Sequence, residues 1–143
     1  MPARKSGHAG ELAPSGRAEV AQLEASTWEE AQALLIAGRR EEAHVVYSRF
    51  LERNPECAGA WADLGALLLD QLCLEEASEA CERALRIDAL HLEAQINLGC
   101  VRLRQERLED AEALVRRVLE LVPERLDASL DLAECRIRQG DLE

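Results

Sequence analysis

The chain of 143 residues is acidic and aliphatic, and both properties limit what it can do. Its formal net charge is −11, so it repels phosphate backbones and we expect no nucleic-acid partner. Hydrophobic residues make up 48% of the sequence and aromatic residues only 3%, so the core must be aliphatic, which suits closely packed helices. No stretch approaches the roughly 20 apolar residues that span a bilayer, so we expect no membrane partner.

The N-terminal residues 1–17 are rich in alanine, glycine, serine and proline, with mixed charge. They contain no apolar run long enough for a signal peptide. We therefore expect residues 1–17 to be a disordered leader and residues 18–143 to form a folded array.

From residue 24 onward, the sequence repeats with a period of 34 residues. Two adjacent columns of the repeat hold Leu64, Leu98 and Leu132, and then Gly65, Gly99 and Ala133. A fixed period of this size indicates stacked supersecondary units, each too small to bury its own apolar face. The expected units are 24–57, 58–91 and 92–125, with a half repeat at 126–143.

Each unit contains two segments with helical periodicity. In the second unit, the apolar face of the first segment holds Trp61, Leu64, Gly65 and Leu68, and that of the second holds Ala77, Cys81, Ala84 and Leu85. Residues 71–73 form the expected turn between them. The equivalent turns of the first and last units carry Gly38 and Gly140, which favour the left-handed conformation that ends a helix.

The charges fit these boundaries. Each second helix begins with an acidic pair: Glu41 and Glu42, Glu75 and Glu76, Glu109 and Asp110. Arginines follow in the later turns, which is the arrangement that a helix dipole favours. Most of the charge therefore has a structural explanation.

The sequence contains no pattern that indicates catalysis or metal binding. Five cysteines are scattered without a CxxC pair, which predicts free thiols and a cytoplasmic location. The three histidines lie far apart, and no phosphate-binding glycine loop or nucleophile motif occurs. We expect no cofactor and no enzymatic activity.

The repeat columns resemble those of the tetratricopeptide repeat, whose pattern is a tryptophan, a Leu-Gly pair, small residues, an aromatic residue and a closing proline. The second unit matches at Trp61, Leu64–Gly65, Ala77 and Ala84–Leu85. The resemblance implies an all-α fold, a right-handed superhelical array of antiparallel helix pairs with about three and a half repeats. Departures from the pattern are Glu30 in place of leucine, and Arg102 and Arg136 in place of aromatic residues.

In this family, the first helices of the repeats line a concave groove. The resemblance therefore implies a non-catalytic scaffold that binds a peptide or a partner helix there. The alternative is the N-terminal segment of a larger enzyme, similar to a glycosyltransferase or a methyltransferase, that recruits its protein substrate. Some members grip a C-terminal carboxylate with lysine and asparagine, but this chain has no lysine past Lys5, and alanines occupy the clamp positions Ala62 and Ala66. We therefore do not expect a chaperone-tail adaptor.

The groove positions implied by the resemblance are Asp63, Ala66, Leu69, Asp70, Ile96, Asn97, Cys100, Arg104, Leu130, Asp131, Glu134 and Arg138. One column, Asp63, Asn97 and Asp131, resembles the asparagine ladder in the repeats of O-linked N-acetylglucosamine transferases. An asparagine amide can donate to and accept from a peptide backbone at once, and only Asn97 has that capacity here. The alternative is that the two aspartates pair with nearby arginines, such as Arg102 or Arg136.

The C-terminal residues 139–143 match residues 105–109, which lead into a second helix. We expect Asp141 to cap such a helix and Glu143 to lie in its first turn. The sequence thus resembles a fragment, in which the first helix of the last repeat lacks the second helix that would cover it. We expect either self-association through the exposed face, which includes Leu132 and Ile137, or a C-terminal end that is only marginally stable.

Overall fold

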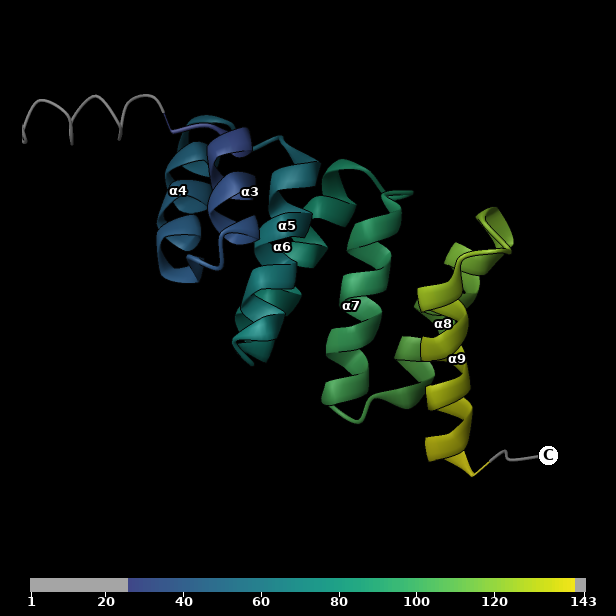
Figure 1. The fold of residues 1–143 in the computed structure, drawn as a ribbon. Coiled ribbons are helices and arrows are strands. Elements are labelled where there is room, and N and C mark those ends of the chain that lie inside the picture. The colour runs from purple at the N-terminus through teal and green to yellow at the C-terminus, as the bar shows by residue number, and fades with distance from the viewer. Residues whose placement is uncertain (1–25, 141–143) are drawn as a thin grey trace, which may run out of the picture. The chain divides into compact units, whose positions relative to one another are not determined.

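A computed structural model describes residues 26–140, and within this range every regular element is a helix (Figure 1). The helices are α3 (Trp28–Ile36), α4 (Arg40–Arg53), α5 (Ala58–Asp70), α6 (Leu74–Ile87), α7 (Leu92–Arg104), α8 (Leu108–Leu121) and α9 (Leu126–Gln139). The predicted all-α fold is confirmed. The expected leader 1–17 and the expected helix start at 141–143 lie outside the described residues.

The chain divides into two compact units, one up to Phe50 and one from Leu51. The first unit holds α3 and most of α4, and the second holds α5 to α9. In the second unit, α5 packs on α6, α7 on α8, and α8 on α9, and the first helices α5 and α7 also contact each other. The helix pairs therefore follow the 34-residue period of the sequence.

Glycine lets the two helices of a repeat approach closely. A Cβ placed on Gly65 would lie 2.5 Å from Sγ of Cys81, and one on Gly99 would lie 3.2 Å from Cγ2 of Val115. Cys81 and Val115 are fully buried, so these contacts lie in the core of each pair. In α9 the same column holds Ala133, which is exposed.

The turn inside each repeat has a left-handed residue, whether or not that residue is glycine. Positive φ values of 79°, 61°, 59° and 86° occur, one period apart, at Gly38, Leu72, Glu106 and Gly140. At the second turn, the N–H of Cys73 donates to the carbonyl of Leu68, and the N–H of Leu72 donates to that of Leu69, both at 2.9 Å. These two bonds form a Schellman motif, so the backbone of the turn is conserved across the repeats while the residue type is not.

Two other departures from the repeat pattern have local explanations. Glu30 closes a capping box, since its carboxylate accepts from the N–H of Thr27 and its own N–H donates to the Thr27 hydroxyl, each at 3.2 Å. Gln95 stands one period after Trp61 and makes the same kind of bond. Trp61 Nε1 donates to the Pro55 carbonyl, and Gln95 Nε2 donates to the Ala89 carbonyl, both at 2.9 Å.

We predict that Leu72→Gly stabilises the chain. A residue with a Cβ is destabilised by about 1–2 kcal/mol in the left-handed region. Glycine removes this strain, but its larger conformational entropy in the unfolded chain offsets part of the gain. Leu72 is 64% exposed, so little burial is lost. The free energy of unfolding in urea, followed by circular dichroism, should rise by about 0.5–1 kcal/mol. Leu72→Ala is the control and should give no such gain; equal values for the two variants would contradict a strained turn.

Candidate functional site

The groove positions inferred from the sequence all lie in the second unit, on α5, α7 and α9. Contacts between α5 and α7, and between α7 and α9, place these three helices next to each other, as Figure 1 shows. We call the surface formed by Asp63, Ala66, Leu69, Asp70, Asn97, Cys100 and Arg104 the first-helix face. It is the part of the predicted site that two adjacent first helices share.

Side chains on the first-helix face differ in exposure. Ala66 and Leu69 are half-buried, whereas Asp70 and Arg104 are exposed at the C-terminal ends of α5 and α7. Ile96 is only 5% exposed and packs against Val115, Val118 and Ala128. Its side chain therefore belongs to the core between repeats and adds little to the surface.

Asn97 joins α7 to α5. Its Nδ2 atom donates to the main-chain carbonyl of Ala62 at a distance of 3.1 Å. The amide thus uses one of its donors inside the molecule, and the side chain is half-buried. The bond links α7 to the backbone of α5 within the first-helix face.

Cys100 on α7 meets Asp131 on α9, so the structure brings these two predicted residues together. The thiol donates to Oδ2 of Asp131 at 3.4 Å. Burial, aided by the negative charge of Asp131, raises the pKa of Cys100 to about 12. Burial also raises the pKa of Asp131. At neutral pH the Cys100 side chain is therefore protonated, and a thiol is a much weaker nucleophile than a thiolate.

Glu134 and Arg138 on α9 form a second link to α7. Arg138 donates to the Leu103 carbonyl at 3.2 Å, and it pairs with Glu134 at 2.5 Å and with Glu106 at 2.9 Å. Leu130 is 62% exposed and lies away from these contacts. Of the predicted α9 residues, Asp131, Glu134 and Arg138 thus take part in contacts between α9 and α7, whereas Leu130 is an exposed apolar side chain.

Arg102 has different partners from those considered for it in the sequence. Its guanidinium is buried, and it donates to Ser78 at 2.9 Å and to Glu82 at 2.7 Å, both on α6. It donates also to Gln105 at 2.9 Å. Asp131 contacts Cys100, so the suggested pairing of Asp131 with Arg102 is wrong. The sequence alone gave no signal for Arg102 as a link between α6 and α7.

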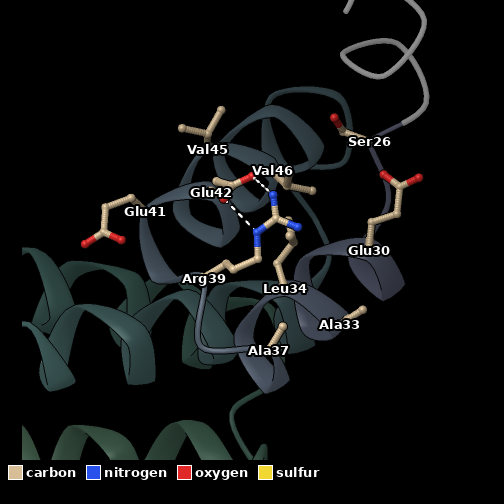
Figure 2. Close-up of a pocket in the computed structure, with 10 residues that line it drawn as sticks. All are labelled: Ser26, Glu30, Ala33, Leu34, Ala37, Arg39, Glu41, Glu42, Val45 and Val46. Atoms are coloured by element: carbon tan, nitrogen blue, oxygen red, sulfur yellow. Dashed lines mark hydrogen bonds and ion pairs between the residues drawn. The ribbon is translucent and has the colours of Figure 1, made fainter. Parts of the chain in front are cut away.

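A separate hollow of about 820 Å³ lies in the first unit between α3 and α4 (Figure 2). Its apolar lining includes Leu34, Val45 and Val46, and an ion pair between Arg39 and Glu42 lies beside them. The hydrogen bonds that Arg39 donates to the Glu42 carboxylate raise the pKa of Arg39. None of the predicted groove residues lies in this unit, so the hollow is not part of the predicted site.

Two further properties of residues 26–140 concern metals and membranes. Within these residues, no three histidine, cysteine, aspartate or glutamate side chains come together as metal ligands. No helix among them has the length and apolar character that crossing a bilayer requires.

A family profile described as tetratricopeptide repeat matches residues 29–91 and 96–143. The matched segments make up more than half of the sequence, so the chain belongs to the tetratricopeptide repeat family. No curated protein matches it. The family and the all-α repeat fold inferred from the columns are therefore confirmed.

Several solved structures have a similar fold. The Arabidopsis OM64 TPR domain aligns with a TM-score of 0.76 and 24% identity, over 81% of this chain and 98% of that one. The first TPR of Spaghetti (RPAP3), bound to the HSP90 peptide SRMEEVD, aligns with a TM-score of 0.76 and 20% identity, over 78% and 89%. The second TPR domain of human RPAP3, in complex with the HSP70 peptide SGPTIEEVD, aligns with a TM-score of 0.71 and 23% identity, over 76% and 90%. At these identities the likeness concerns the fold. The resemblance to transferase repeats stays a prediction.

We predict that the five free thiols react at very different rates in the folded chain. Burial raises the pKa of Cys81 and Cys100 to about 12 each, so at roughly pH 8 about one thiol in ten thousand is in the reactive thiolate form at these sites. Alkylation by iodoacetamide, read by mass spectrometry of peptides, should be much slower at Cys81 and Cys100 than at the half-buried Cys57 and Cys73. All five should react alike in denaturant. Fast labelling of Cys100 in the folded chain would rule out the buried thiol described above.

Proposed function

We propose that this tetratricopeptide repeat chain is a non-catalytic scaffold that binds a segment of a partner protein along its first-helix face. Two TPR domains with a similar fold have structures in complex with chaperone peptides. These structures support protein or peptide binding as the class of function for this chain. The contacts between α5 and α7, which leave the first-helix face at their junction, support the choice of this face. An enzyme that carried this segment to recruit its substrate would use the same face.

The observation that carries the proposal is the combination of side chains left open between α5 and α7. Half-buried Ala66 and Leu69 offer a shallow apolar strip, and exposed Asp70 and Arg104 lie at its end. Arg104 makes no hydrogen bond or ion pair within residues 26–140. Apolar contact with a few convergent polar groups is the usual composition of a binding site.

The charge and the side-chain types of the first-helix face limit which classes of ligand can bind there. No lysine occurs in the described residues, and Ala62 is buried with its carbonyl bonded to Asn97. The lysine–asparagine clamp that grips a C-terminal carboxylate is therefore not available in its familiar form. We propose instead an internal segment with an apolar side chain for the strip of Ala66 and Leu69 and a carboxylate for Arg104.

The test is a matched pair of arginine substitutions. A peptide of about 12 residues is selected from a random display library against the full chain, and its affinity is measured by fluorescence anisotropy. Arg104→Ala should weaken binding by roughly tenfold, because a charge-assisted hydrogen bond is lost. Asn97 is a poorer probe, since its loss also breaks the bond to Ala62.

The control is Arg86→Ala, because Arg86 is also an exposed arginine but lies on the second helix α6. It should leave the affinity unchanged. An affinity that depends on Arg86 and ignores Arg104 would move the binding site to the second helices and refute the proposal.

A further inference from the structure

The hollow between α3 and α4 in the first unit carries aliphatic side chains that the described residues leave partly open (Figure 2). Leu34 and Val46 line it and are half-buried, and Val45 lines it and is 51% exposed. Branched aliphatic side chains gathered in one open hollow indicate a surface that another segment covers.

The polar residues that line the hollow leave one acidic group available. Glu42 pairs with Arg39, and the Glu30 carboxylate accepts a hydrogen bond from the N–H of Thr27. Glu41 is exposed and makes no hydrogen bond or ion pair within residues 26–140. The hollow therefore suits an apolar segment that also carries a basic residue.

The third repeat shows from which direction this side of a first helix is covered. Arg102 of α7 stands two periods after Leu34 of α3. Its guanidinium is buried and donates to Ser78 and Glu82 on α6, the helix that precedes α7 in the chain. This side of α7 therefore faces the segment that comes before it. For α3, the segment that comes before it is residues 1–25, which lie outside the described residues.

Residues 17–25 have the position and the length to fill the hollow. They join α3 through Ser26, which itself lines the hollow. The segment has nine residues, as α3 does, so even a helical conformation would span the length of α3. Because the segment is covalently attached, its effective concentration at the hollow exceeds that of a separate molecule.

The residue types of this segment match the lining. Val20 and Leu23 are its two large aliphatic residues, three positions apart, and Arg17 is its only basic residue. Glu41 lies in the first turn of α4, beyond the C-terminal end of α3. A segment that runs from Ser26 back along α3 therefore brings Arg17 to the end of the hollow where Glu41 lies.

We propose that residues 17–25 of the chain itself pack in the α3–α4 hollow, with Val20 and Leu23 against its aliphatic lining and Arg17 paired with Glu41. The contact covers the apolar side chains of the first unit. It leaves the first-helix face of the second unit as the surface that is open to a partner.

The test is methyl NMR spectroscopy of the full chain with labelled leucine and valine methyl groups. We expect nuclear Overhauser contacts between Leu23 and Val45 or Val46. Leu23→Asp should shift the methyl resonances of both valines, because a charged side chain does not enter an apolar hollow. Leu12→Asp is the matched control, since Leu12 is the other leucine among residues 1–25, and it should leave these resonances unchanged.

A charge exchange tests the proposed ion pair. Arg17→Glu should weaken the contacts of Leu23 with the hollow, because it sets two like charges against each other. Adding Glu41→Arg to Arg17→Glu should restore the contacts, which a purely apolar role of the segment does not predict. Contacts that keep their full strength in Arg17→Glu would refute the ion pair.

A mixture of labelled and unlabelled chains separates contacts within one chain from contacts between chains, and circular dichroism must show the parental helicity for each variant. Absence of any contact between Leu23 and the hollow overturns the proposal and leaves the hollow to a partner protein. Contacts found only between chains overturn it too, because the hollow then holds the segment of a second copy.

Discussion

In the pairs α5–α6 and α7–α8, the two helices pack so closely that the first helix carries glycine at the contact. At Gly65 a methyl group would overlap the buried sulfur of Cys81, and at Gly99 it would press on Val115. The second helix of each pair packs against the side of the first helix that carries the glycine. The opposite side of α5 and α7 therefore faces the neighbouring first helix and solvent. The first-helix face is thus a consequence of packing around two glycines.

The polar groups between the first helices act mainly as links. Asn97 reaches the Ala62 carbonyl, Cys100 reaches Asp131, and Arg138 reaches the Leu103 carbonyl. Each link crosses from one repeat to the next and gives a backbone carbonyl or a side chain there a hydrogen-bond partner. Among residues 26–140, Arg104 makes no such link, and for this reason we propose it as the side chain that contacts a ligand.

The 34-residue period and the glycine columns were sufficient to predict the helix pairs, their order and their family. Neither residue type at Leu72 and Glu106 indicates the left-handed conformation found there; the signal lies in the period, which puts both residues in the column of Gly38 and Gly140. The sequence could not show that Asn97 bonds to Ala62 or that Arg102 pairs with Glu82. Those contacts depend on how neighbouring helices are offset along their axes, which sequence spacing does not specify.

We propose that this chain binds its partner on the face between α5 and α7. Chemical-shift mapping of the ¹⁵N-labelled chain with a bound, library-selected peptide tests it most directly. We expect the largest changes on α5 and α7, around Ala66, Leu69 and Arg104, with little change along the outer sides of α6 and α8. Changes concentrated on α6 and α8, with the amides of α5 and α7 unmoved, would contradict it.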